Sequence, residues 1–242
     1  MGNIVFFDRS IPEIGYYART TTKGRELDMV YEYLQFLEEY YSKRKNKKAA
    51  VFIEPLIDSG YPDIVIAEYH ESNYDIWNDS RFKLSNKDLK ILYHIQINKC
   101  INEKDMHSIL GYSQHDIDSA LSRLIECDLI RYYKSGTIRN ISINKYCRIT
   151  KLIAIEAKID KWKSAIMQAE NNTWFSTESY ILLNRNGCKS IVQEMCREYG
   201  IGIILVNKGV DCILKSEKRN FPVSHASLLF NEYIHRYVRN GS

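Results

Sequence analysis

The segment Leu152–Ala157 constrains the fold of this 242-residue chain more than any other stretch. It reads Leu-Ile-Ala-Ile-Glu-Ala and lacks the alternation of a strand with one face in water. Continuous apolar strands are typical of sheets that are covered on both faces. Because strand and helix patterns alternate after this segment, we predict an α/β fold, an α/β/α sandwich with a mixed sheet.

Other patterns along the chain fit such a layered domain. A helix is expected from about Lys23 to Tyr41, and the turn Asp58-Ser59-Gly60 joins an extended pair over Ala49–Ile57 and Asp63–Ala67. After residue 158, the patterns predict helices over Asp160–Asn171, Ser190–Tyr199 and Ala226–Val238, and strands over Tyr180–Leu183, Gly202–Val206 and Cys212–Leu214.

Residues 84–146 have a different pattern. Ser85 and Ser113 are expected to cap two helices, and a third helix, Glu103–Leu110, stops at Gly111. A β-hairpin over residues 129–143 follows. Helices followed by a small hairpin are the order of elements in winged helix-turn-helix proteins, which residues 113–130 resemble. We therefore predict an inserted winged helix-turn-helix domain over 84–146 and a discontinuous domain over 1–83 and 147–242.

Three charged residues lie at the ends of apolar strands. Asp63 follows Pro62 and opens one strand, whereas Glu156 and Lys158 close another. Residues two apart in a strand point to the same face, so Glu156 and Lys158 share one. Burying a charge without partners is costly, and a bound cation would explain the arrangement. Carboxylate oxygens are the ligands that Mg²⁺ or Mn²⁺ prefers.

These residues also resemble a known family. The stretches Tyr61-Pro62-Asp63-Ile64-Val65-Ile66 and Ile155-Glu156-Ala157-Lys158 resemble the signature of the PD-(D/E)XK, or restriction endonuclease-like, nucleases. The resemblance extends to Trp162, Ala165, Gln168 and Ala169, which match a W-x-x-A-x-x-Q-A pattern on the following helix. It covers roughly residues 20–70 and 150–215. One departure is that about 90 residues separate the two motifs, where the family usually has a short turn.

The resemblance implies a set of site residues. Asp63 and Glu156 would hold Mg²⁺ or Mn²⁺, Lys158 would act on the attacking water or bind the phosphate, and Gln168 would support them. An acidic residue of the first helix would join the metal, with Glu26 as the best match and Glu32 as the second. Glu54 is a further candidate on the strand before Asp63. For the inserted domain, candidate nucleic-acid contacts are Arg123, Arg131, Tyr133, Lys134 and Arg139.

The expected function is metal-dependent, endonuclease-like hydrolysis of DNA phosphodiester bonds, with the winged helix positioning the DNA, a duplex rather than a single strand. Two alternatives stay open: a non-catalytic DNA-binding regulator, and a protein-interaction subunit built on a nuclease-like scaffold. The oligomeric state is also open. An enzyme that cleaves both DNA strands with one active site per chain often works as a homodimer or in a larger assembly.

Composition limits the classes of protein and the cellular locations that fit this chain. No apolar run approaches the roughly 18 residues of a membrane span, so no membrane association is expected. The six cysteines are scattered and form no CxxC pair, which argues against a zinc site or a disulfide framework. Free thiols fit a cytoplasmic location. The net charge of +4 permits a polyanionic partner without identifying one.

Overall fold

The computed structural model describes residues 3–19, 24–44, 47–70 and 77–240. Its contacts divide the chain into two compact units. The first unit comprises Met1–His70 and Ile149–Pro222, and the second comprises Glu71–Arg148 and Val223–Ser242. None of the helices that the structure describes combines the length and the apolar character needed to cross a membrane.

A seven-stranded mixed sheet forms the centre of the first unit, in the order β1-β2-β3-β7-β8-β9-β10. The pairs β1–β2, β7–β8 and β8–β9 are parallel, and β2–β3, β3–β7 and β9–β10 are antiparallel. The predicted α/β fold with a mixed sheet is thus confirmed. The strands are β1 (Ile4–Phe7), β2 (Lys48–Ile53), β3 (Ile64–Tyr69), β7 (Ile149–Lys158), β8 (Glu178–Asn184), β9 (Gly202–Val206) and β10 (Val210–Leu214).

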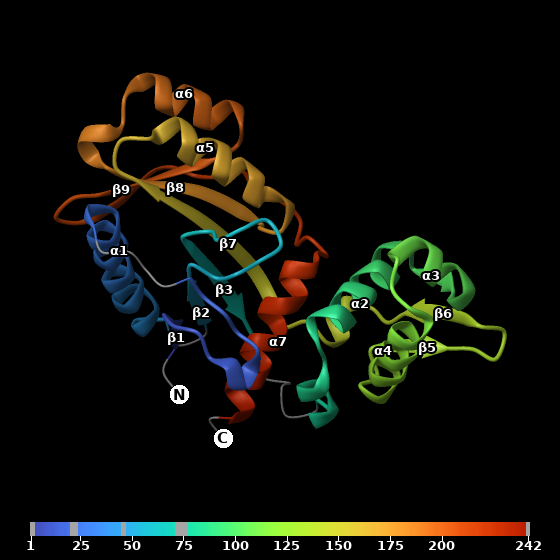
Figure 1. Cartoon of the computed structure of the whole chain (residues 1–242). Coiled ribbons are helices and arrows are strands. Elements are labelled where there is room, and N and C mark those ends of the chain that lie inside the picture. The colour runs from blue at the N-terminus through green and yellow to red at the C-terminus, as the bar shows by residue number, and fades with distance from the viewer. Residues whose placement is uncertain (1–2, 20–23, 45–46, 71–76, 241–242) are drawn as a thin grey trace. The chain divides into compact units, whose positions relative to one another are not determined.

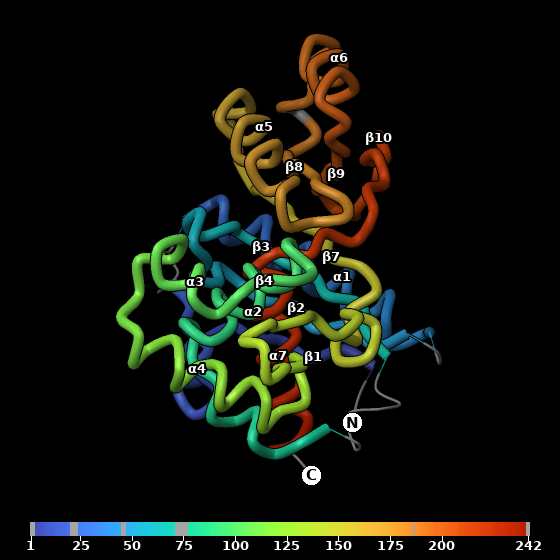
Figure 2. The backbone as a smooth tube through the Cα atoms, turned by 90° about the vertical axis from the view of Figure 1, so that its right-hand side faces the viewer, coloured from blue at the N-terminus to red at the C-terminus, as the bar shows by residue number. Residues whose placement is uncertain are grey.

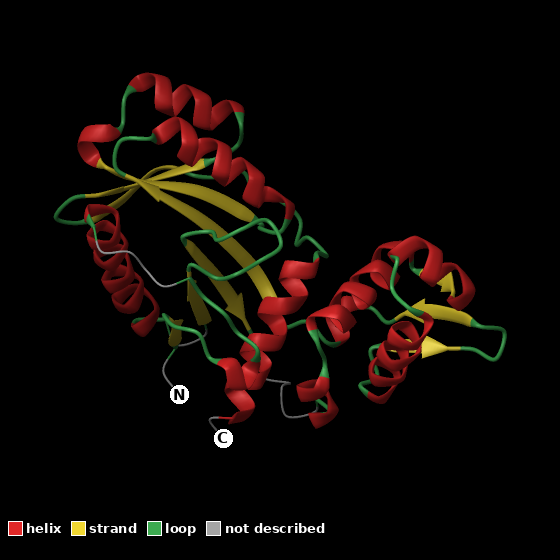
Figure 3. Ribbon diagram, in the orientation of Figure 1, coloured by secondary structure: helices red, strands yellow, loops and turns green. Residues whose placement is uncertain are grey.

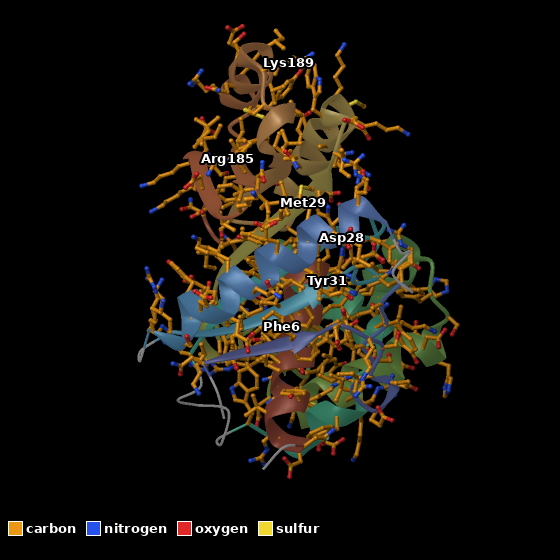
Figure 4. The ribbon with its side chains drawn as sticks, turned by 90° about the vertical axis from the view of Figure 1, so that its left-hand side faces the viewer. Phe6, Asp28, Met29, Tyr31, Arg185 and Lys189 are labelled. Carbon is orange, nitrogen blue, oxygen red and sulfur yellow. The ribbon has the colours of Figure 1, made fainter. Side chains whose placement is uncertain are left out.

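Helices cover both faces of this sheet (Figure 1). Helix α1 (Arg25–Ser42) packs on one face, and α5 (Trp162–Asn171) and α6 (Ser190–Glu198) pack on the other. Figure 2 shows α5 and α6 together on their side of β8 and β9. Each helix buries one apolar stripe, as the 3.6-residue period requires. Figure 4 views α1 from outside, where Asp28 and Tyr31 are exposed although Met29 between them is buried.

Most predicted elements of the first unit are observed with boundaries shifted by a few residues. The helix expected from Lys23 is α1, although Lys23 itself lies outside the described residues. Strand β1 was not predicted, because four residues are too few for a periodicity to show. Short 3₁₀ turns occupy Pro12–Ile14, Asn172–Trp174 and Arg185–Gly187.

The second unit combines helices with a small sheet (Figure 3). Ser85 and Asp88 form a reciprocal capping box at the start of α2, and Ser113 caps α4. The sheet has the strand order β4-β6-β5 and is antiparallel. The elements are α2 (Asn86–Asn98), β4 (Cys100–Asn102), α3 (Glu103–Leu110), α4 (Gln114–Glu126), β5 (Ile130–Tyr132), β6 (Thr137–Asn140), α7 (His225–Asn240) and 3₁₀ turns at Asp79–Lys83 and Ile143–Lys145.

The observed division differs from the predicted domain boundaries of 84 and 146 in two elements, the 3₁₀ turn Asp79–Lys83 and α7, which both belong to the second unit. This C-terminal helix groups with the second unit, where it packs on α2. Within that unit Glu232 of α7 forms a buried ion pair with Arg81, and both side chains are 2% exposed. The apolar period of α7 predicted a helix with a buried face, but periodicity does not say which surface covers that face.

Candidate functional site

The strand register brings Asp63 and Glu156 together. Ile64 of β3 is paired with Ile155 of β7 in antiparallel register, so the next residues outward, Asp63 and Glu156, face each other. Side chains directly opposite each other in such a pair lie on the same face. The Asp63 carboxylate is further held by the backbone N–H of Ala157, which donates to Oδ2 at 2.7 Å.

Lys158 brings a cation to this pair of carboxyl groups. Its Nζ lies 3.3 Å from Oδ2 of Asp63 and donates to the carbonyl oxygen of Ala157 at 2.9 Å. The Lys158 and Asp63 side chains are only 16% and 14% exposed, so water screens their attraction weakly. Glu26, in the first turn of α1, lies 3.9 Å from the same amine and accepts a hydrogen bond from the N–H of Ile159.

Glu156 is the buried member of the group, with 3% of its surface exposed. Burial raises the pKa of its carboxyl to about 8, and the negative charge of Asp63 and a hydrogen bond with Asp63 act in the same direction. Asn172 and Lys158 act in the opposite direction. Asn172 does so by donating from Nδ2 to Oε1 of Glu156 at 2.7 Å. The protonated form of the Glu156 carboxyl is therefore favoured where it faces Asp63.

A pocket of about 80 Å³ opens beside these groups. That space is large enough for several water molecules. Glu156 does not line it and instead contacts the Asp63 carboxylate. The lining residues are Arg19, Glu26, Leu27, Val30, Ile53, Glu54, Asp63, Ala157 and Lys158.

Comparisons of the chain with protein families, with curated proteins and with solved structures found no match. The chemistry of the site is therefore inferred from its own residues.

Carboxylates, the residue type that a hard divalent cation prefers, lie at this site. Glu26, Glu54 and Asp63 line the pocket with the cations Arg19 and Lys158, and Glu156 contacts Asp63. Burial raises the pKa of Glu156 most, and the negative charge of Asp63 raises it further; a divalent cation would offset that second effect. Among the described residues, no three His, Cys, Asp or Glu side chains form a cluster that could hold a metal ion. Mg²⁺ is commonly held by only one or two carboxylates together with waters and substrate phosphates.

Two of the predicted acidic or amide residues lie elsewhere. Gln168 is exposed on α5 and is not among the residues that line the pocket. The amide that does reach Glu156 is Asn172, one turn further along, which sequence analysis missed. Nothing in its local pattern distinguishes it from its neighbour Asn171. Glu32 accepts a hydrogen bond from the N–H of Gly209, so Glu26 is the glutamate of α1 that reaches the pocket.

Arg19 is a second residue that sequence analysis missed. It lies in an irregular segment after η1 (Pro12–Ile14), where no periodicity indicates the direction of a side chain. Its guanidinium forms a two-fold hydrogen bond with Glu54, and both residues line the pocket. Glu54, predicted as a further acidic candidate, thus reaches the pocket as the partner of an arginine.

In the second unit, the structure separates the predicted nucleic-acid contacts into two groups. Arg123 makes a two-fold ion pair with Asp88, which is fully buried, at 2.8 and 2.9 Å. This guanidinium binds Asp88, the partner of Ser85 in the capping box of α2. Arg131 and Arg139 instead oppose each other across β5 and β6, and both are exposed.

Two further residues of the hairpin, Tyr133 and Lys134, lie beside these arginines. Arg139 lies over the ring of Tyr133 at 5.5 Å, and Lys134 is exposed in the turn that follows. No ion pair among the described residues involves Arg131, Lys134 or Arg139. Like charges placed opposite each other repel, and this hairpin presents a concentrated positive charge at its surface.

Proposed function

We propose that the first unit hydrolyses phosphodiester bonds of DNA with the help of Mg²⁺ or Mn²⁺, as an endonuclease-like enzyme. The observation that carries the proposal is the contact of Asp63 with both Glu156 and Lys158 at the wall of an open pocket. Neighbouring strand ends supply two carboxyl groups and an amine, and Glu26 faces the same amine. Such a set is suited to a cation and a phosphate.

Asp63 and Glu156 would hold the metal ion, with Glu26 contributing from α1. A bound Mg²⁺ or Mn²⁺ supplies a water of lowered pKa and offsets charge that develops on the phosphate. Ion binding at Glu156 requires its carboxyl to lose the proton that burial and Asp63 favour.

The chain's own groups supply orientation and proton control. The N–H of Ala157 fixes the rotation of the Asp63 carboxylate, and Asn172 does the same for Glu156. Lys158 donates hydrogen bonds from an amine whose position Asp63 and the Ala157 carbonyl restrict. This amine can donate to a phosphate oxygen or to the attacking water in the pocket.

Topology supports a restriction endonuclease-like fold for this unit. Asp63 precedes β3 and Glu156 and Lys158 end β7, its hydrogen-bonded neighbour, as the resemblance to PD-(D/E)XK nucleases implies. The helix that carries Glu26 packs on one face of the sheet. The helix that follows the Glu-x-Lys strand packs on the other through Ala165 and Ala169.

For the second unit, we propose a winged helix-turn-helix module that binds duplex DNA through its hairpin. The support comes from α2, α3 and α4 followed by β5 and β6, and from the opposed cations Arg131 and Arg139. Helix α4 presents acidic residues to water, among them Asp118 and Glu126. The hairpin, with its arginines, Tyr133 and Lys134, is therefore the better surface for phosphates than α4.

The test is cleavage of supercoiled and linear DNA by the full chain in Mg²⁺, in Mn²⁺ and in EDTA. We expect metal-dependent nicking by the wild type and its loss in Asp63→Asn. Asp28→Asn is the matched control, because this substitution removes the same charge from a residue that is exposed on the outer face of α1. Equal activity of the wild type and Asp63→Asn would refute the assignment.

The same experiment separates the two alternatives. A non-catalytic DNA-binding regulator would bind duplex DNA in a salt-dependent way and cut it in neither metal. A protein-interaction subunit would show neither binding nor cutting. The proposed enzyme would do both, and Asp63→Asn would retain only the binding.

A further inference from the structure

Arg19 and Glu54 form a paired unit at the pocket that the metal-binding set does not use. The Nε of Arg19 donates to Oε2 of Glu54 at 3.1 Å, and a terminal nitrogen donates to Oε1 at 2.8 Å. The backbone N–H of Arg19 also donates to the carbonyl oxygen of Glu54 at 3.0 Å. Three hydrogen bonds thus join these two residues across 35 positions of sequence.

The backbone of Glu54 is held in an uncommon conformation beside this pairing. Glu54 follows β2 and has a φ of 45°, in the left-handed region that residues with a side chain rarely adopt. Its N–H donates to the carbonyl oxygen of Asp63 at 3.0 Å, which ties it to the candidate metal-binding residue. Strained residues of this kind persist where the surroundings hold them, and they concentrate at functional sites.

Within the described part of the chain, the Arg19 guanidinium keeps donors available for another partner. A guanidinium has five N–H donors, and Glu54 engages two of them. The Arg19 side chain is 51% exposed, and its guanidinium lies 5.5 Å from the ring centre of Tyr61. It lines the same pocket as Asp63 and Lys158.

We propose that Arg19 is a phosphate-binding residue of this site and that Glu54 positions it. The forked guanidinium of Arg19 would donate hydrogen bonds to a phosphate of the DNA backbone beside the bond to be cut. The inference rests on the proposed hydrolysis of DNA. Arginine is suited to this task because its planar donors match two phosphate oxygens, whereas a lysine offers a point charge. Glu54 engages one edge of the fork and so directs the remaining donors.

The first experiment measures binding without metal, where no cleavage occurs. The affinity of the full chain for a labelled duplex is determined in EDTA over a range of salt concentrations. Loss of one phosphate contact lowers the slope of log affinity against log salt by about 0.9. We expect this change in Arg19→Gln and no change in Lys43→Gln, which removes the same charge from a side chain that is 77% exposed at the far end of α1.

The second experiment measures cleavage in Mg²⁺. Arg19→Gln should lower kcat/KM about tenfold through the loss of a charge-assisted hydrogen bond. Arg19→Lys should recover the salt slope without the full kcat/KM, since it keeps the charge and loses the fork. Glu54→Gln should raise KM more than it lowers kcat, since a positioning residue acts through Arg19. Urea unfolding of each variant shows whether the fold is retained.

The outcomes distinguish this inference from the proposed function. If the wild type cuts DNA and Arg19→Gln matches it in salt slope and kcat/KM, Arg19 does not bind phosphate, and the nuclease assignment stands. If the wild type does not cut DNA, and Arg19→Gln still shows a salt slope lower by about 0.9, the phosphate contact stands and the hydrolysis is refuted.

Discussion

Asn172 donates a 2.7 Å hydrogen bond from its side-chain amide to the buried carboxyl of Glu156. The bond joins the first residue after α5 to the end of β7, and both partners are almost completely inaccessible to water. A buried acceptor that loses its donor also loses the compensation for its desolvation. This bond therefore links the stability of the first unit to the ionisation of the candidate metal-binding residue.

The first prediction removes that donor. Asn172→Ala should lower the free energy of unfolding by about 1–3 kcal/mol at pH 9, where Glu156 is ionised, and by less at pH 6. Urea unfolding at the two pH values in EDTA checks it. Asn171→Ala is the matched control, because Asn171 is exposed and makes no side-chain capping bond. Equal losses in both variants would contradict the prediction.

The second prediction concerns the pH dependence of stability. The pKa of Glu156 is about 8 in the folded chain against 4.5 for an unperturbed glutamate, so the folded state binds more protons between these values. The free energy of unfolding should therefore fall as the pH rises from about 4.5 to about 8 and level off above that. Glu156→Gln does not titrate, so it should be more stable than the wild type at pH 9, on the order of 5 kcal/mol.

Urea unfolding of Glu156→Gln and the wild type in EDTA, at pH 5 and pH 9, measures this difference. Glu170→Gln is the control, since Glu170 is exposed on α5. A wild type whose stability does not decline between pH 5 and pH 9 relative to Glu156→Gln would show that Glu156 titrates normally.

The third prediction compares two glutamates of one helix. Glu26 faces the Lys158 amine, whereas Glu32 bonds to the Gly209 backbone. Glu26→Gln should raise the Mg²⁺ concentration for half-maximal DNA cleavage about tenfold, because supporting ligands contribute to metal affinity. Glu32→Gln should leave it unchanged. Titration of nicking with Mg²⁺ checks both, and a larger effect of Glu32→Gln would exclude Glu26 from the site.

The fourth prediction assigns Arg123 to stability. Arg123→Leu would leave the fully buried carboxylate of Asp88 without its ion pair. We expect a loss of about 3 kcal/mol in the free energy of unfolding of the second unit, measured by urea denaturation. The control is Arg139→Leu, whose guanidinium is exposed and lies over the ring of Tyr133. If Arg123→Leu retains full stability but weakens DNA binding, Arg123 belongs to the DNA surface.

The fifth prediction concerns the hairpin. Arg131→Gln should weaken duplex binding and lower the salt slope by about 0.9, with no loss of stability, because it relieves the repulsion from Arg139. Fluorescence anisotropy with a labelled duplex, together with urea unfolding, checks both parts. Lys83→Gln, which removes an exposed cation paired with Glu126, should leave the slope unchanged. An unchanged slope in Arg131→Gln would exclude the hairpin as a DNA contact.

Local patterns were sufficient for the elements whose signal lies within a few neighbouring residues. The apolar run before Glu156 predicted a buried strand, and Ser85, Gly111 and Ser113 predicted helix ends, because capping and burial act over short distances. The placement of Asp63 and Glu156 at the ends of two strands followed from the same patterns. Their pairing also required the register of β3 against β7, which the resemblance to a family suggested and no local signal contains.

What the sequence by itself determined is therefore the order of strands and helices and the three charged residues Asp63, Glu156 and Lys158 at strand ends. Only the tertiary structure decided that Asn172 rather than Gln168 reaches Glu156, that Arg19 enters the pocket with Glu54, and that α7 packs in the second unit. The physical reason is that hydrogen bonds and packing between distant segments depend on register and on which faces meet. Periodicity reports only which face of an element is apolar.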